Sequence, residues 1–457
     1  MRGGILRSTI RLDSVVPQLD LYSIGGIIGI LFPTHLFMAQ LCIRGGKQLS
    51  GSLRVLGSKN AALPLLSAAL LTDQPVVLRS IPTIADVQSM LRLLSDAGVE
   101  IEQRGHMVRL CAHRVSAGHL NRETVGSLRG SILLLGSLLG RLRQVVLPRP
   151  GGDIIGARPI DTHLDAFCQL GAVVEVRGDE IFIDGTKVQA GTVTLREFSV
   201  TATENILMLA ATLSGTTTIH IAACEPHVVA LADLLTLMGA RIAGAGTSTI
   251  TVHGKRRLSG AEFANISDML EAGFFILMAA ATGSPLTIED VPVDHLRLFF
   301  KKLDDIGIKY SIGKSSSFPS VSIQPSRLRA FHMQSIPHPG IATDLQPAFA
   351  VVATQAHGSS LIHDPLYDDR FKHIIELQKM GAKAYICDPH RVVIEGPTPL
   401  HGRAIPSLDI RSGATLVMAG LVAEGETIIS GAEIIDRGYE NLPQRLARLG
   451  ADISLEL

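Results

Sequence analysis

The chain has 457 residues, a formal net charge of zero, 46% hydrophobic residues and 18% charged residues. This balance suits a large buried core, and the length fits two or three domains. Aromatic residues make up only 4% of the chain and Trp is absent. The composition therefore excludes a single-stranded nucleic-acid binder, which needs aromatic stacking platforms and a basic groove.

The cysteines indicate free thiols in a reducing compartment. Their number is odd, they are widely spaced, and no two form a C-x-x-C pair, so neither a disulfide framework nor a zinc site is expected. We therefore expect a cytoplasmic protein. The cysteines are Cys42, Cys111, Cys168, Cys224 and Cys387.

The first 37 residues differ from the rest. Three arginines precede an apolar stretch over residues 21–37 that is broken by glycines and Pro33. A signal peptide is one interpretation, but no small-x-small cleavage site follows. A membrane helix is another, but the stretch only reaches the minimum span. We favour a third, in which Met38 is the start of the folded protein and residues 1–37 are an extension outside the fold.

An internal repeat organises the remaining sequence. A helical phrase that ends in a hydrophobic residue and Gly, followed by an alternating strand, recurs about every 70 residues, too long a period for a helical solenoid. Copies are LLSDAGVEIE, FCQLGAVVEV and LARLGADISL. The repeated glycines are Gly98, Gly171, Gly239, Gly307, Gly381 and Gly450.

A second phrase precedes each of these copies. It has a polar start, a run of small apolar residues and then a Gly-led strand, as in TENILMLAATLSG and RSGATLVMAGLVAEG. Each unit thus reads as helix, strand, helix, strand, turn, strand, which predicts an α/β fold. Six units fit two domains of three, with the most apolar helices inside and the sheets around them.

Polar residues at the start of the apolar helices are candidate ligand-binding groups. A helix N-terminus attracts anions, so a cation there is unfavourable unless an anionic ligand accompanies it. Three cations in equivalent repeat positions thus predict a phosphate or carboxylate site. The segment GSK at 57–59 does not have the spacing of a P-loop. The candidates are Lys59, Asn60, Arg129, Glu204, Asn205, Asp344, Leu345, Gln346 and Arg411.

A Pro/Gly-rich loop is the other candidate. PRPGGDIIGARPIDTHLDAF spans residues 148–167 and combines hinge residues with Asp153, Arg158, Asp161 and His163. Such a loop can close over a substrate. Taken alone, Asp153 reads as a turn aspartate and His163 as a structural histidine.

Together these motifs resemble the UDP-N-acetylglucosamine 1-carboxyvinyltransferase (MurA) family from about Met38 to Leu457. The matching segments are GSKNAALPLLSAALL, LPRPGGDIIGARPIDTHL, HPGIATDLQPAFA, DDRF, LDIRSGATLVMAG and DRGYENL. The resemblance implies a two-domain inverted α/β barrel of the EPSP synthase type, with six βαβαββ-type repeats. We place one domain at residues 38–58 plus 268–457, and the other at 59–267 with a catalytic loop at 148–159.

The resemblance implies transfer of the enolpyruvyl group of phosphoenolpyruvate to the sugar 3-hydroxyl, through a tetrahedral ketal from which phosphate leaves. Asp344 would be the base and Asp153 the acid, with Lys59 and Arg411 also catalytic. It implies small-molecule substrates only, with no metal, organic cofactor, nucleic acid or membrane. The implied phosphoenolpyruvate contacts are Lys59, Asn60, Arg129, Arg158, Arg370 and Arg411. The implied UDP-N-acetylglucosamine contacts are Asn60, Arg129, Arg158, Pro159, Ile160, Asp161, Thr162, Glu197, Phe198, Ser199, Val200, Asp344 and Leu366.

Some positions depart from the family pattern. Asp153 stands where Cys is usual, as in a minority of members, so we expect insensitivity to fosfomycin, which alkylates a thiolate there. An ordinary Asp has a pKa near 3.9, so we expect loop closure on phosphoenolpyruvate to raise the pKa of Asp153. Glu197 replaces a usual Lys, Met269 an Arg and Thr201 a Gly. Two alternatives stay open: a non-catalytic UDP-sugar-binding paralogue and a 5-enolpyruvylshikimate-3-phosphate synthase-type transferase.

Overall fold

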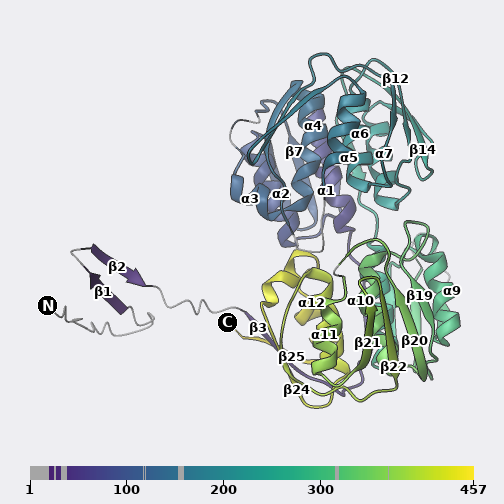
Figure 1. Cartoon of the computed structure of the whole chain (residues 1–457). Coiled ribbons are helices and arrows are strands. Elements are labelled where there is room, and N and C mark those ends of the chain that lie inside the picture. The colour runs from purple at the N-terminus through teal and green to yellow at the C-terminus, as the bar shows by residue number, and fades with distance from the viewer. Residues whose placement is uncertain are drawn as a thin grey trace.

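The computed structural model describes residues 20–24, 27–31, 39–116, 118, 120–152, 159–313, 319–368 and 370–456. Its helices and sheets form two lobes, one above the other in Figure 1. Each lobe has its own cluster of buried hydrophobic residues: one cluster draws on residues 61–258, and the other on residues 41–55 and 270–449. We call them the upper and lower lobe.

The upper lobe contains the sheets β15-β5-β7-β6, β8-β10-β9 and β11-β12-β14-β13. Its helices are α1 (Lys59–Ala68), α2 (Ala85–Asp96), α3 (Arg122–Ser127), α4 (Leu133–Leu142), α5 (Asp161–Gln169), α6 (Val200–Ala211) and α7 (Pro226–Leu237). Its strands are β5 (Val76–Arg79), β6 (Glu100–Arg104), β7 (Met107–Cys111), β8 (Gln144–Pro148), β9 (Val173–Arg177), β10 (Glu180–Asp184), β11 (Thr192–Thr194), β12 (Gly215–His220), β13 (Arg241–Ala243), β14 (Thr249–Gly254) and β15 (Ala261–Ala264).

The lower lobe contains the sheets β17-β18-β16-β4, β19-β20-β22-β21 and β23-β24-β3-β25. Its helices are α8 (Met269–Ala281), α9 (Arg297–Ile306), α10 (Gln346–Gln355), α11 (Lys372–Lys379), α12 (Ile410–Val422) and α13 (Leu442–Arg448). Its strands are β3 (Gln40–Arg44), β4 (Gly51–Arg54), β16 (Leu286–Glu289), β17 (Lys309–Ile312), β18 (Val321–Gln324), β19 (His332–Gln334), β20 (Gly358–His363), β21 (Lys383–Asp388), β22 (Arg391–Gly396), β23 (Ala404–Pro406), β24 (Glu426–Ser430) and β25 (Asp452–Glu456). Short 3₁₀ helices are η1 (Ala69–Leu71), η2 (Arg129–Ile132), η3 (Val293–Leu296), η4 (Thr343–Leu345) and η5 (Ala432–Arg437).

The most apolar helix of each unit lies inside its lobe, as the sequence predicts. In α8 every residue from Leu270 to Ala281 is buried, and in α12 every residue from Ile410 to Leu421. Helices α4 and α6 pack against each other in the upper lobe, and α10 packs against α8 and α12 in the lower lobe. Figure 1 shows β12 and β14 on the outer side of the upper lobe's helices. The predicted fold class is confirmed.

The six repeated glycines share one conformation. Each follows the second helix of its unit and has a positive φ, between 84° at Gly307 and 110° at Gly239. Residues with a Cβ rarely adopt this region, and glycine there ends a helix and turns the chain into the next strand. The regular spacing of these glycines therefore marks six equivalent turns.

The chain crosses between the lobes twice. Strand β4 belongs to the lower lobe but leads into α1 of the upper lobe, and β15 belongs to the upper lobe but leads into α8 of the lower lobe. The two crossing segments are bonded to each other: Ser58 N–H donates to Ile266 O at 2.7 Å, and Asp268 N–H donates to Leu56 O at 2.9 Å. The first helices of the two lobes therefore begin side by side.

The second unit departs from the repeat. Its sheet has three strands, β8-β10-β9, and α3 takes the place of the opening strand among the described residues. The side chain of Asn121 caps α3 by accepting from Thr124 N–H at 2.8 Å. Gly152 N–H donates to Gly126 O at 3.2 Å, so the C-terminal end of α3 holds the start of the Pro/Gly-rich loop.

One predicted helix start is wrong. Glu204 and Asn205 do not open α6 but lie in its second turn, both buried. Ser199 caps the helix earlier, because its hydroxyl accepts from Ala202 N–H at 3.4 Å. These two residues therefore face the core and are not at the helix end.

The N-terminal residues contribute two strands, β1 (Asp20–Ile24) and β2 (Ile27–Leu31), which pair with each other as an antiparallel hairpin. In the described part of the chain they join none of the sheets of the lobes. Within those same residues, we find no helix with the length and hydrophobicity that a membrane crossing requires.

Two repeat glycines of the upper lobe give a stability test. A Cβ at Gly98 would lie 2.2 Å from the Arg114 carbonyl oxygen, whereas one at Gly239 would meet only the flexible side chain of Lys255 at 3.2 Å. Both have positive φ, so we expect Gly239→Ala to lower the free energy of unfolding by about 1–2 kcal/mol. Gly98→Ala should cost about 1–3 kcal/mol more because the backbone must also shift. Denaturant titration of both variants measures the difference, and equal losses would show that the clash has no effect.

Candidate active site

The residues of the lower lobe that are predicted to be catalytic or to bind phosphoenolpyruvate lie together at the junction. Asp344 is in η4, Arg411 is the second residue of α12, and Arg370 precedes α11. Arg370 Nη2 lies 2.8 Å from one carboxylate oxygen of Asp344, and Arg411 Nε lies 3.1 Å from the other. The Asp409 carboxylate caps α12 and fixes its first turn by accepting from the N–H groups of Arg411 and Ser412.

Two opposing effects set the pKa of Asp344. Burial raises it, but the charges of Arg411 and Arg370, the hydrogen bond from Arg411 and the charge of Lys59 together lower the pKa to about 2. The carboxylate is therefore ionised at neutral pH and is a weak base while both arginines hold it.

The two arginines retain unused donors. Their side chains are only 3% and 7% exposed, and in the described residues Arg370 Nε and Arg411 Nη1 have no hydrogen-bond partner. Arg411 also lies over the ring of Tyr439 at 5.2 Å. A buried donor left unpaired is costly, so these N–H groups are suited to a bound phosphate or carboxylate.

Lys59 and a residue without a predicted role meet at a shared carboxylate. Lys59 is the first residue of α1, and its Nζ lies 2.8 Å from Asp86 Oδ2. Asp86 is 8% exposed, and its other oxygen lies 2.8 Å from Nε of Arg437, from the opposite lobe. Sequence reasoning missed Asp86 and Arg437, although DRGYENL, which contains Arg437, is one of the matching motifs.

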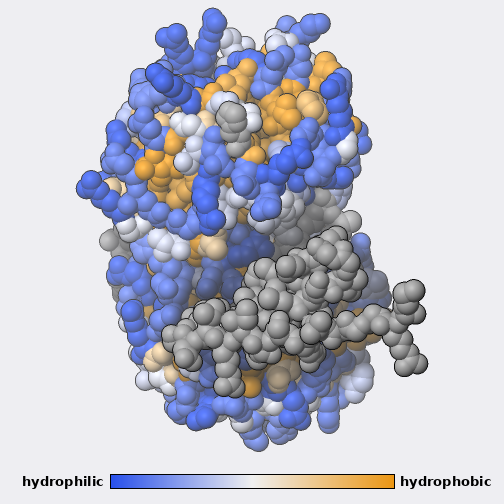
Figure 2. All heavy atoms as spheres, turned by 90° about the vertical axis from the view of Figure 1, so that its left-hand side faces the viewer, coloured by the Kyte–Doolittle hydropathy of each residue, from blue (hydrophilic) through white to orange (hydrophobic). Residues whose placement is uncertain are grey.

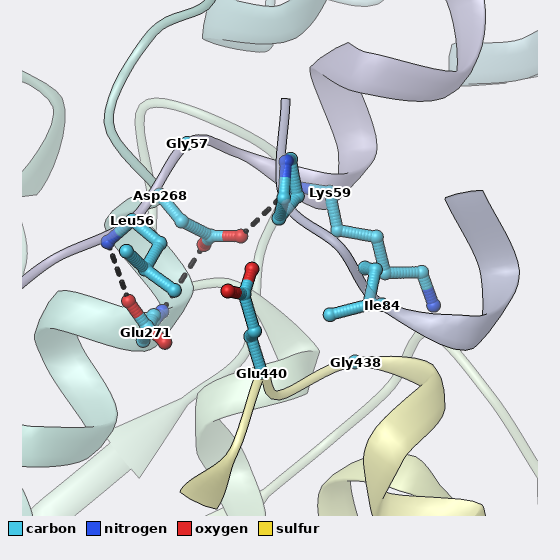
Figure 3. A pocket seen from close by; sticks show the side chains of 9 residues that line it. Leu56, Gly57, Lys59, Ile84, Asp268, Glu271, Gly438 and Glu440 are labelled. Carbon is cyan, nitrogen blue, oxygen red and sulfur yellow. Dashed lines mark hydrogen bonds between the residues drawn. The ribbon is translucent and has the colours of Figure 1, made fainter. Parts of the chain in front are cut away.

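Contacts between the lobes close over the junction. The Glu440 carboxylate accepts from Thr83 N–H at 2.7 Å and lies 2.9 Å from His106 Nε2. Figure 3 shows Lys59, Ile84, Asp268 and Glu440 around a cavity at this point, whose volume is about 10 Å³. That is room for about one water molecule, so the lobes must part to admit a larger ligand here.

The predicted UDP-sugar segments also converge in part. Pro159 to Thr162 lead into α5, and Arg129 Nη2 donates to the Pro159 carbonyl oxygen at 3.3 Å. The Thr162 hydroxyl donates to Glu197 at 3.1 Å. Ser199 caps α6, and Phe198 is 53% exposed.

The other predicted contacts belong to other elements or lie outside the described residues. Leu366 belongs to the lower lobe and is 38% exposed. Asn60 is the second residue of α1 and is half-buried, and Met269 opens α8 next to its cap Asp268. Asp153 and Arg158 lie outside the described residues. No group of three His, Cys, Asp or Glu residues is arranged to hold a metal ion within the ranges that the structure describes.

The surface at the junction matches these polar side chains. Figure 2 shows an apolar area on one face of the upper lobe, whereas the uncovered part of the level where the lobes meet carries white and blue residues. The cationic side chains at the junction therefore suit a charged ligand better than this apolar area does.

The comparisons agree with this geometry. The model of the family "EPSP synthase (3-phosphoshikimate 1-carboxyvinyltransferase)" matches residues 43–446. The crystal structure of the enolpyruvyl transferase NikO from Streptomyces tendae is similar, with a TM-score of 0.83 and 25% identity over 92% of this chain and 99% of that one. EPSP synthase from Acinetobacter baumannii shares the fold, with a TM-score of 0.72 and 20% identity over 92% of this chain and 100% of that one.

Fold and junction thus define a member of the EPSP synthase family, the fold class of enolpyruvyl transferases. The UDP-N-acetylglucosamine 1-carboxyvinyltransferase 1 of Streptococcus agalactiae is 39% identical over 92% of this chain and 99% of its own length. The UDP-N-acetylglucosamine 1-carboxyvinyltransferase of Coxiella burnetii is also 39% identical, over 91% and 96%. Within the family, the chain belongs to the UDP-N-acetylglucosamine 1-carboxyvinyltransferases, and the resemblance seen in the sequence is confirmed.

His163 gives a test of the electrostatics near Arg129. Burial and the charge of Arg129 lower the pKa of His163 to about 3, and its Nε2 lies 2.8 Å from the Thr201 hydroxyl. The unfolded chain binds this proton near pH 6.5, so below that pH the unfolded state gains it and folding stability falls as pH decreases towards 3.

We expect His163→Gln to remove this component. Between pH 7 and pH 5 the variant should lose about 2 kcal/mol less stability than the parent protein. Denaturant titrations at the two pH values measure the loss, with His253→Gln as a control for removing an exposed imidazole from the same lobe. An unchanged pH dependence in His163→Gln would contradict the buried neutral histidine.

Proposed function

We propose that the protein transfers the enolpyruvyl group of phosphoenolpyruvate to the 3-hydroxyl of UDP-N-acetylglucosamine and releases phosphate, the first committed step of peptidoglycan precursor synthesis. The 39% identity to enzymes named for this reaction supports it. The observation that carries the proposal is the half-buried Asp344 carboxylate between two buried arginines that keep unpaired donors. A cytoplasmic location would suit these substrates.

The cations of the junction would hold the phosphate and carboxylate of phosphoenolpyruvate. Arg370 and Arg411 can bind either group bidentately, because a guanidinium presents a planar fork of donors. Lys59 and Arg437 face the same junction and now share Asp86. Arg129 and Arg158 complete the proposed set. No cofactor is needed in this scheme, since fixed cations and helix N-termini stabilise the charge that develops on the phosphoryl group.

Phosphoenolpyruvate would also activate the base. When its anionic groups form ion pairs with Arg370 and Arg411, those arginines stabilise the Asp344 carboxylate less. The pKa of Asp344 therefore rises from about 2. Asp344 then takes the proton of the 3-hydroxyl as that oxygen attacks C2 of phosphoenolpyruvate. Asp153 would donate a proton to the methylene carbon, and the resulting tetrahedral ketal would lose phosphate and a methyl proton to restore the double bond.

The nucleotide would lie along the upper lobe. Residues 159–162 and 197–200 are brought together by the Thr162 to Glu197 hydrogen bond, which supports a shared UDP-sugar surface. Leu366 would approach from the lower lobe. We further propose that the lobes are the two domains, 38–58 plus 268–457 and 59–267, and that they open and close around the substrates.

The function is tested by measuring phosphate release from phosphoenolpyruvate in three parallel reactions. They contain UDP-N-acetylglucosamine, shikimate 3-phosphate or no acceptor. We expect release only with UDP-N-acetylglucosamine, and Asp344→Asn should lower the turnover about 10²- to 10⁴-fold while the UDP-sugar still binds. Asp305→Asn, at an exposed aspartate of α9, is the matched control. Release with shikimate 3-phosphate would instead make the protein an EPSP synthase-type transferase. Binding of the UDP-sugar without turnover would make it a non-catalytic paralogue.

The aspartate at position 153 predicts fosfomycin insensitivity. A carboxylate is a much weaker nucleophile than a thiolate, so preincubation with fosfomycin should leave phosphate release unchanged, whereas Asp153→Cys should be inactivated with time. Asp153→Asn is the control, because it removes the carboxylic acid without introducing the thiol that Asp153→Cys adds. Time-dependent inactivation of the parent protein would overturn the expectation.

A further inference from the structure

A second cavity lies in the upper lobe, at the opposite ends of the helices that reach the junction. Its volume is about 500 Å³. Arg143 and Thr212, the C-cap residues of α4 and α6, both line it. Figure 1 shows β12, whose first residue Gly215 also lines the cavity, at the end of the upper lobe away from the lower lobe. A cavity of this size is typical of small-molecule sites.

The lining is polar and positively charged. It combines two arginines with hydroxyl and amide side chains and contains no acidic residue. The lining residues with these polar groups are Arg143, Arg256, Gln189, Thr212, Ser214 and Thr216. Val188, Ala190 and Leu213 supply an apolar part of the wall.

The two arginines lack an anionic partner. In the described residues neither side chain makes a hydrogen bond or an ion pair, and Arg256 lies between two further cations, Lys255 and Arg257. Burial and the nearby charge of Arg256 lower the pKa of Arg143, while Arg256 itself is exposed. Two like charges facing one cavity favour a bound anion that offsets the repulsion.

The backbone at Arg143 adds an independent observation. Arg143 has φ of 67° and ψ of −13°, a left-handed conformation that helix ends usually assign to Gly or Asn. Its N–H donates to Leu139 O at 3.0 Å, and its carbonyl oxygen accepts from Gly185 N–H at 2.7 Å. These bonds hold the strained residue so that its guanidinium lines the cavity, and strain of this kind concentrates at functional sites.

We propose that this outer cavity binds the phosphoryl group of a small phosphorylated metabolite, at a site separate from the junction. Two guanidinium forks match the charge and the three oxygens of a phosphoryl group better than the two oxygens of one carboxylate. The Ser214 hydroxyl offers a further donor, whereas the Thr216 hydroxyl is already bonded to His253 Nδ1 at 2.9 Å. The apolar wall leaves room for the rest of the molecule. The site does not depend on the proposed reaction.

The test is calorimetric titration of the full chain with inorganic pyrophosphate, in the presence of saturating UDP-N-acetylglucosamine. Arg256→Gln and Arg143→Asn should each weaken binding about tenfold or more, since each removes a charged donor pair. Asn tolerates the left-handed conformation, so the second variant should fold. Arg257→Gln removes the same charge from the next residue, which does not line the cavity, and should change binding by about twofold or less.

Four outcomes would overturn the proposal. The first three are absence of pyrophosphate binding, an equal loss of affinity in Arg257→Gln, and no loss of affinity in either cavity variant. The fourth is displacement of pyrophosphate by phosphoenolpyruvate, which would place the pyrophosphate at the junction. Vesicles containing phosphatidic acid are tested in parallel. Vesicle binding without pyrophosphate binding would assign the basic residues to a lipid surface and would also overturn a metabolite site.

Discussion

The double crossing of the chain at Ser58 and Asp268 is the constraint on which the site depends. The Asp268 carboxylate caps α8 and also accepts from the Lys59 N–H at 3.2 Å, so it joins the starts of the first helices of both lobes. Each lobe then repeats its own unit so that α1, α10 and α12 begin at the junction. Residues far apart in the sequence reach one place because equivalent helix starts do.

Cations at helix N-termini are electrostatically unfavourable, and carboxylates of the protein itself neutralise them. Lys59 and Arg411 stand where the helix dipole disfavours positive charge. Asp86 and Asp344 neutralise them, each shared between two cations. The two carboxylates therefore form the ion pairs that a substrate anion would otherwise form with these cations. Binding of a substrate anion then replaces one set of ion pairs by another. This exchange costs less than creating new buried charge, because the cations are already desolvated.

The regular features of the fold were predictable, and the long-range pairs were not. Gly98 and its five equivalents make the repeat visible in the sequence, because the turn after each second helix has a positive φ, which favours glycine. Glu204 was misplaced because its unit begins at a Ser cap one turn earlier. The pairing of Arg437 with Asp86 joins residues from opposite lobes, and no local pattern records such a contact. The left-handed conformation of Arg143 could not be predicted either, because the position holds neither Gly nor Asn, the residues that usually adopt it.

The buried helix α4 carries positive charge near both of its ends, but for different physical reasons. At its N-terminal end α4 follows Arg129, which the dipole disfavours and which a bound anion can stabilise. At its C-terminal end the dipole favours Arg143, so the unfavourable contributions there are the left-handed backbone and the nearby Arg256. The dipole therefore cannot explain why Arg143 and Arg256 lie together. An anionic ligand in the cavity would offset the like charges, and it would bind at the far end of α4 from the junction.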